Sequence, residues 1–308
     1  MTELLYRHDL AKLRDRISTY LERKAAVWIL FDNLDKGWST QGVDEIDATV
    51  LRGLIDAGRK IEREMRRAGR SLRCIVFVRN DVYEHIMRHS ADYGKEMRAV
   101  LDWTEPDLLR EMLRLRLVSA FDAKARDFRF EQIWPTFCVS HYHGDESADY
   151  LIERSLMRPR NVLKIFNHCR GFATNFRHAK IDEEDIERGL RAYSNDLLVE
   201  LDHELADVFP AARDLLYHFL DATALMTASE LSSLIGRAGV DANSVRRVID
   251  FLIYYGVLGL RTDEGDLFIY RVNYNPKMIE ARAQRMGESA HYLINPAFWP
   301  ALNIKPAV

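Results

Sequence analysis

AAVWILFDNLD occupies residues 25–35 and decides how the amino-terminal part of this chain is interpreted. Its first seven residues are apolar and mostly bulky, and they stop abruptly at a run dominated by polar side chains. A short apolar run of this kind indicates a β-strand buried on both faces, as strands are in a parallel sheet. A second apolar run, at residues 74–78, also ends in polar side chains. We therefore predict two parallel strands that belong to one sheet.

Helical patterns surround these two strands. Apolar residues recur at three- and four-residue steps between residues 10 and 24 and over residues 44–68. A weaker strand candidate lies at residues 99–103, and Thr104 then resembles the N-cap of a helix that reaches about residue 123. Strands that alternate with helices at this spacing are typical of an α/β layer fold.

Composition narrows the class of protein. The chain has 308 residues and a formal net charge of −3, which favours about two folded domains and argues against a globally basic nucleic-acid binder. No apolar run approaches the roughly 20 residues that span a bilayer, and the first residues do not resemble a signal peptide. The three cysteines show no CxxC spacing, which favours reduced thiols. We expect a cytoplasmic protein.

The remainder of the chain predicts two further modules. Residues 128–200 are helical in pattern, with breaks near Gly144 and Pro159. Three short amphipathic helices at 209–223, 229–237 and 244–254 precede a hairpin at 257–270, which together indicate a winged helix. The proline-containing residues beyond Asn275 suggest an extended tail. The predicted domains are therefore 1–125, 126–203 and 204–275, followed by the tail at 276–308.

Asp32 follows the first predicted strand directly, at the edge of a parallel sheet where α/β folds bind ligands. In phosphoryl-transfer enzymes an aspartate at this position holds Mg²⁺, and a second acid nearby orients the attacking water. Asn33 cannot act as a base, so Asp35 is the better candidate for the second acid. A polar turn after a strand would have the same composition without any such role.

Two further sets of polar side chains could contact phosphate. Arg79 and Asn80 follow the second strand and could report the presence of a γ-phosphate. Arg158 and Arg160 flank Pro159, which predicts a helix start, and the planar fork of arginine binds phosphate oxygens in a bidentate manner. Taken singly, both sets are also common in ordinary strand ends and surface turns.

Together these segments resemble one family. Residues 29–38 look like the Walker B segment of a P-loop NTPase, closest to the bacterial STAND and KAP ATPases that include FunZ-like and "DNA repair ATPase" proteins. Residues 78–81 resemble the end of the sensor 1 strand, 101–109 the next strand and helix, and 158–167 the sensor 2 helix of the lid. The resemblance implies ATP and Mg²⁺ as cofactors. It also implies a nucleotide-dependent regulator in DNA repair or antiviral defence, with a winged helix after the lid.

One departure from the family is large. No Gly-x-x-x-x-Gly-Lys-Ser/Thr loop occurs in this sequence, and the residues that would hold the β- and γ-phosphates are missing with it. Family members carry this Walker A loop on a strand in the middle of the sheet. We therefore expect either a missing amino-terminal half or a partner subunit that supplies it, or a chain that has abandoned nucleotide binding. Alone, it should not hydrolyse ATP appreciably.

Other patches favour less specific interpretations. Eight basic residues between Arg52 and Arg73 could contact nucleic acid or a neighbouring subunit, although a solvated helix explains them as well. Residues 204–275 contain ten acidic and six basic side chains, which favours protein contact over DNA binding. Cys138, His141 and His143 only superficially resemble a metal cluster. The competing hypothesis is a non-enzymatic winged-helix DNA-binding or adaptor protein with a degenerate NTPase scaffold.

Overall fold

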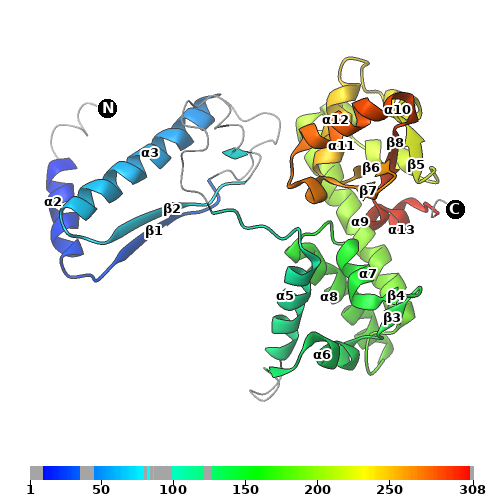
Figure 1. Ribbon diagram of the computed structural model, residues 1–308, viewed down its shortest axis with the longest axis horizontal. Coiled ribbons are helices and arrows are strands. Elements are labelled where there is room, and N and C mark those ends of the chain that lie inside the picture. The colour runs from blue at the N-terminus through cyan, green and yellow to red at the C-terminus, as the bar shows by residue number, and fades with distance from the viewer. Residues whose placement is uncertain are drawn as a thin grey trace. The chain divides into compact units, whose positions relative to one another are not determined.

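A computed structural model of the protein describes residues 10–34, 45–79, 82–83, 86, 99–120 and 127–305. The chain divides into two units, Met1–Ala99 and Val100–Val308 (Figure 1). The fold is mixed α/β, with more helix than strand and with small sheets. Within the described ranges, no helix combines the length and the apolar character needed to cross a lipid bilayer.

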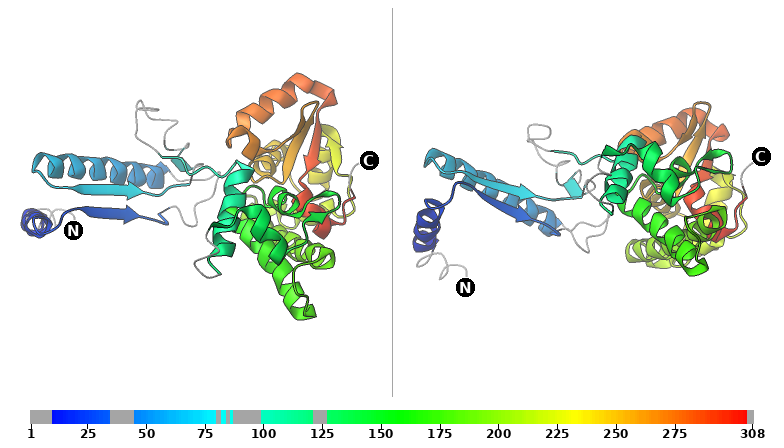
Figure 2. Two further views of the ribbon diagram at one scale, coloured as in Figure 1. Left: turned by 60° about the horizontal axis from the view of Figure 1, so that its bottom comes forward. Right: turned by 90° about the horizontal axis from the view of Figure 1, so that it is seen from below.

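The first unit contains the two predicted parallel strands. β1 (Val27–Phe31) pairs with β2 (Leu72–Val76) in parallel, with Phe31 opposite Val76. The helices α2 (Leu10–Leu21) and α3 (Glu45–Arg67) precede and connect them, and α3 runs along the strands (Figure 2). Both strands therefore end at the same edge of the sheet, as the sequence predicts.

α3 covers one face of this pair. A Cβ atom added at Gly58 would lie 3.3 Å from the Cβ of Cys74, so glycine permits close contact between helix and strand. The Glu62 carboxylate of α3 also accepts a hydrogen bond from the backbone N–H of Cys74. Side chains alternate along a strand, and the other face of β1 carries Trp28 and Leu30, which are 61% and 59% exposed. On the α3 side, Ile29 and Cys74 are half-buried, so the face of β1 that carries Trp28 and Leu30 is the more exposed one.

The third strand expected at residues 99–103 is not present, because these residues have no regular secondary structure. The following helix, α5 (Pro106–Val118), begins after Glu105 rather than at Thr104. It belongs to the second unit, where Leu109, Leu113 and Leu117 are buried in the main hydrophobic core. Tertiary packing of this apolar stripe places the helix outside the predicted NTPase part of the chain.

Helices form the first half of the second unit. α6 (Phe130–Phe137), α7 (Ser147–Glu153), α8 (Pro159–Phe176) and α9 (Glu183–Val208) follow α5, and the short strands β3 (His141–Tyr142) and β4 (Asp145–Glu146) form a hairpin before α7. α8 and α9 pack tightly, since a Cβ added at Gly189 would lie 2.7 Å from the backbone nitrogen of Cys169. The Trp134 indole N–H donates to the Ser147 hydroxyl at 2.8 Å and ties α6 to α7.

A four-stranded sheet organises the second half. Its order is β5 (Leu225–Thr227), β8 (His291–Ile294), β6 (Leu258–Thr262) and β7 (Gly265–Leu267), and all of its pairs are antiparallel. α10 (Ala228–Arg237) and α11 (Val245–Tyr254) lie where the sequence predicts helices, and β6–β7 is the predicted hairpin. The segment expected to be the first of these helices instead contains two 3₁₀ segments, Pro210–Ala212 and Leu215–Phe219.

Two expectations about the end of the chain are corrected by the structure. Residues 276–308 do not form an extended tail, because they contain α12 (Pro276–Met286), the central strand β8 and the short helix α13 (Trp299–Leu302). Pro276 stands at the start of a helix, where its missing N–H costs nothing. The boundary expected at 203/204 falls inside α9, and one continuous core joins the residues on either side of it.

Candidate functional site

Asp32 and Arg79 lie at the same edge of the β1–β2 sheet. Asp32 follows the last residue of β1, and Arg79 comes three residues after the end of β2. The Phe77 N–H donates to the Phe31 carbonyl at 2.9 Å, which continues the strand pairing by one step toward Arg79. The sequence prediction that strand ends bring these two side chains to one sheet edge is therefore consistent with the backbone pairing.

The turn after β1 presents the Asp32 carboxylate to solvent. Asn33 has a positive φ of 59°, a conformation that asparagine tolerates better than most residues, and its N–H donates to Asp32 Oδ1 at 2.8 Å. One exposed carboxylate suits a water-mediated contact to Mg²⁺ but does not by itself form a magnesium site. Asp35 and Asn80, the other acid and amide predicted here, lie outside the described residues.

The two predicted lid arginines have different surroundings at the start of α8 in the second unit. Arg158 is the N-cap of α8 and half-buried, and its Nη2 donates to the Tyr255 carbonyl at 3.4 Å. Arg160 lies in the first turn of α8 and is exposed. The preceding residues Leu156 and Met157 both have positive φ, which forces a sharp turn before Pro159. Arg160 is consequently the better placed of the two to contact a ligand.

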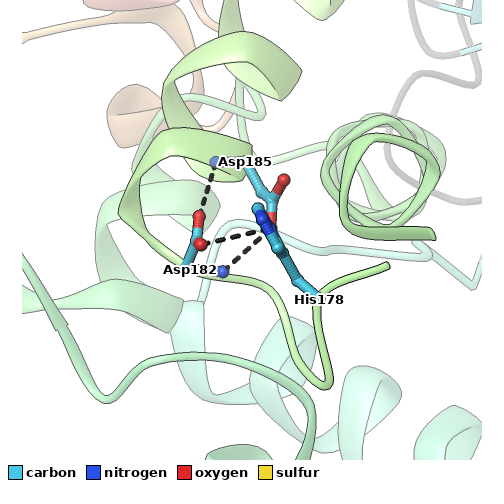
Figure 3. Close-up of side chains that lie close together, drawn as sticks. All are labelled: His178, Asp182 and Asp185. Atoms are coloured by element: carbon cyan, nitrogen blue, oxygen red, sulfur yellow. Dashed lines mark hydrogen bonds and ion pairs between the residues drawn. The ribbon is translucent and has the colours of Figure 1, made fainter. Parts of the chain in front are cut away.

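A cluster that the sequence analysis did not single out joins the end of α8 to the start of α9. His178 Nδ1 lies 2.8 Å from Asp185 Oδ2 and 3.1 Å from Asp182 Oδ2 (Figure 3). Asp182 and Asp185 also form a reciprocal capping box, in which each backbone N–H donates to the other carboxylate. Asp185, with Asp182 beside it, raises the pKa of His178. The capping box is visible in the sequence, whereas the approach of His178 depends on how the loop closes.

These three residues also form a geometric group that could hold a cation, since one ligand atom from each lies within 4.8 Å of the others. Asp185 is fully buried, yet the oxygen that has no hydrogen-bond partner among the described atoms is Oδ1, not the Oδ2 that contacts His178. Every polar contact inside the cluster is explained by helix capping and an ion pair. The arrangement is therefore a structural link between two helices.

Cys138, His141 and His143 do not form a metal cluster of this kind within the described part of the chain. Cys138 is fully buried, whereas both histidines are exposed on the β3–β4 hairpin. Burial raises the pKa of the Cys138 thiol to about 11, which is unfavourable for a metal-binding thiolate. The interpretation of these histidines as incidental loop residues is retained.

Several charged residues of α11 and the β6–β7 hairpin form ion pairs, some with α12, whereas the exposed Arg247 of α11 lies over the Phe209 ring. Arg246 of α11 contacts Asp250 at 3.1 Å and Glu280 at 3.0 Å. Arg282 contacts Glu264 of the hairpin at 3.1 Å. A surface prepared for DNA phosphates would present unpaired cations instead. The preference for protein contact over DNA binding stays a prediction.

Comparisons with known proteins give one family model and one distant relative. Residues 107–202 match the model of the FunZ-associated C-terminal helical domain, and the structure is mostly helical over α5–α9, which spans this range. A protein of Escherichia coli (strain K12) described as "Putative transposon gamma-delta 80.3 kDa protein" is 22% identical over 215 residues. The match covers 68% of this chain but only 29% of that protein. No solved structure matches.

Proposed function

We propose that this chain is the carboxyl-terminal portion of a P-loop ATPase of the STAND/KAP type that acts as a nucleotide-dependent switch. The observation that carries the proposal is the parallel β1–β2 pair, which places Asp32 and Arg79 at one sheet edge. The match of residues 107–202 to a FunZ-associated helical domain supports it, because the sequence resemblance to FunZ-like ATPases rests on both parts of the chain.

Each side chain has a proposed task in the complete assembly. Asp32 would hold the magnesium ion through water, Asp35 would orient the attacking water, and Arg79 would sense the γ-phosphate. Arg160 is preferred over Arg158 as the lid arginine, because Arg158 already donates to the Tyr255 carbonyl. Bound Mg²⁺ would neutralise charge on the phosphates. The present residues supply no phosphate-binding loop, so ATP binding is assigned only to the chain joined by a segment that carries one.

The second half of the larger unit is proposed to be a winged-helix module that contacts protein. α10 and α11 supply its helix-turn-helix, and the β6–β7 hairpin supplies its wing. The acid partners of Arg246 and the acid-rich hairpin argue against DNA readout as its main task. The role in DNA repair or antiviral defence follows from the family resemblance alone. The name of the E. coli relative adds an association with a transposon.

ATP hydrolysis by a complemented assembly tests this proposal. The chain is mixed with the part of the E. coli relative that lies outside the matched region, and phosphate release from Mg·ATP is measured. We expect no turnover by either component alone, turnover by the mixture, and about a tenfold or larger loss with Asp32→Ala. Asp56→Ala, which removes an exposed acid on α3, is the matched control and should be silent. Equal turnover with and without Asp32 would refute the assignment.

A further inference from the structure

The end of the first unit where β1 and β2 begin is rich in cations. The residues just after α2 meet there with those that run from the last turn of α3 into β2, and the Val27 N–H donates to the Ser71 carbonyl at 2.9 Å. Figure 2 shows both strands pointing away from α2. We call this region the basic end, and its cations are Arg23, Lys24, Arg66, Arg67, Arg70 and Arg73.

Few negative charges offset these cations. Residues 22–24 and 66–73 hold six basic side chains and one acidic side chain, Glu22, whereas the whole chain has a net charge of −3. The carboxyl ends of α2 and α3 add about half a negative charge each through their macrodipoles. About four positive charges are therefore left uncompensated, which is more than the two helix ends require.

Most of these cations have no anionic partner within the chain. Within the described ranges, Arg70 is the member that forms an ion pair, with Glu22, and its guanidinium also donates to the Ser18 carbonyl of α2. The other five members are exposed and have no ion pair among the described residues. In contrast, Arg246 and Arg282 of the second unit are paired with acids. The basic end is therefore free to bind an anion from outside.

Two exposed aromatic rings lie beside these cations. Tyr20 of α2 is 57% exposed, and Lys24 Nζ lies 5.1 Å from the centre of its ring. Trp28 of β1 is 61% exposed and lies opposite Arg73 of β2 in the strand pairing. Proteins bind single-stranded nucleic acid with this combination, because exposed rings stack on bases while the cations contact phosphates.

The combination of rings and cations also distinguishes between polyanions. A duplex keeps the faces of its bases stacked inside, so it would contact the cations and leave both rings unused. An anionic membrane takes up the continuous apolar face of a helix, whereas Trp28 lies in a strand that is held by its pairing with β2. Five of the six cations are arginines, whose planar fork matches two phosphate oxygens. These features favour a single strand.

We propose that the basic end binds single-stranded nucleic acid, with phosphates on its exposed arginines and bases stacked on Tyr20 and Trp28. The site lies where β1 and β2 begin, whereas Asp32 and Arg79 follow the ends of these strands. It therefore requires no nucleotide at that edge, and the inference goes beyond the proposed switch.

Binding of a fluorescently labelled oligothymidylate to the full chain, followed by anisotropy without ATP, tests the site. The oligonucleotide is about 20 nucleotides long, which exceeds the usual length of one single-strand site. Arg66→Gln/Arg67→Gln removes two phosphate contacts, so we expect affinity about tenfold or more weaker and a salt dependence about 1.4 shallower in log K against log salt. The control Arg170→Gln/Arg237→Gln removes two exposed arginines of the second unit and should leave the affinity unchanged.

The aromatic part of the site has its own test in the same assay. Tyr20→Ala should weaken binding about fivefold or more, whereas Tyr20→Phe keeps the ring and should bind as the unaltered chain does. Three results would overturn the inference. These are no saturable binding at low salt, binding that is indifferent to Arg66→Gln/Arg67→Gln, and equal or greater affinity for a duplex of the same length or for vesicles that contain phosphatidylserine.

Discussion

The contact between α8 and α9 predicts a large effect from adding a single methyl group. In Gly189→Ala, the new Cβ would lie 2.4 Å from Cys169 Sγ, 2.7 Å from its backbone nitrogen and 2.8 Å from its Cα. Carbon atoms in normal contact are separated by about 3.5–4.0 Å. Two of the three crowded atoms belong to the backbone, which cannot turn away, so the helices themselves must separate.

Two opposing terms set the size of this effect. Overpacking of a well-packed core costs about 1–3 kcal/mol, and crowding against backbone favours the upper end of that range. Alanine has a helix propensity about 1 kcal/mol more favourable than that of glycine in a helix interior, and this gain offsets part of the cost. The net expectation for Gly189→Ala is a loss of about 2 kcal/mol in the free energy of unfolding.

Gly171→Ala is the matched control, because Gly171 lies within α8 and a Cβ there would meet nothing within 4 Å. Only the propensity gain remains, so this variant should be stabilised by up to about 1 kcal/mol. Denaturant-dependent alkylation of the fully buried Cys138, quantified by peptide mass spectrometry, reports unfolding of this unit. If Gly189→Ala is as stable as Gly171→Ala, the described packing of α8 against α9 is wrong.

Three further predictions concern thiols, pH and capping. Burial raises the pKa of both the Cys138 and the Cys74 thiols, but Cys138 is fully buried and Cys74 is partly exposed, so maleimide should label Cys74 first in the native chain, and equal rates would contradict the packing. Asp185 and Asp182 raise the pKa of His178 in the folded chain. The ion pair of protonated His178 with these carboxylates therefore stabilises the fold fully below about pH 6.5, and this stabilisation is lost as the pH rises through the folded pKa of His178. His178→Gln should therefore destabilise the chain more at pH 6 than at pH 9 in denaturant titrations, and an equal loss at both would argue against the ion pair. The Thr227 hydroxyl caps α10 by accepting a hydrogen bond from the Glu230 N–H, so Thr227→Ala should lower the free energy of unfolding by about 1 kcal/mol in the same titration. An unchanged free energy of unfolding would show that this cap does not stabilise the helix.

Local patterns were sufficient to predict many elements from the sequence. The apolar runs around Trp28 and Ile75 indicated parallel strands, and these strands are paired in the structure. Pro159 correctly indicated the start of α8, and the acids after Ile181 indicated the start of α9. In each case, the signal lies in neighbouring residues, so no knowledge of the tertiary fold was needed.

Elements that depend on distant partners could not be predicted in this way. β8 is central to its sheet because His291–Ile294 pairs with β5 and β6, both far away in the sequence, and the prolines around it suggested an extended tail instead. α5 resembled part of the first domain until its buried leucines placed it in the second core. The boundary expected at 203/204 lies inside the continuous helix α9, because a helical sequence pattern gives no signal where one module ends and the next begins.

In the candidate site, too, local sequence signals could be interpreted correctly, whereas contacts between distant residues could not be predicted. Asp32 and Arg79 could be assigned to one sheet edge because parallel strands end together. The difference between Arg158 and Arg160 required the Tyr255 carbonyl, which is 97 residues away from Arg158 in the sequence. His178 likewise needed the loop between α8 and α9 to bring it to Asp185.

The central claim is that this chain carries one half of a nucleotide site. The most direct test is to measure binding of a fluorescent ATP analogue in the presence of Mg²⁺. The titration compares the chain alone with the chain complemented by the part of the E. coli relative outside the matched region. We predict saturable binding only for the complemented chain, with affinity about tenfold or more weaker in Asp32→Ala and unchanged in Asp56→Ala. Binding by the chain alone, or binding by the complemented chain that is indifferent to Asp32, would contradict the account.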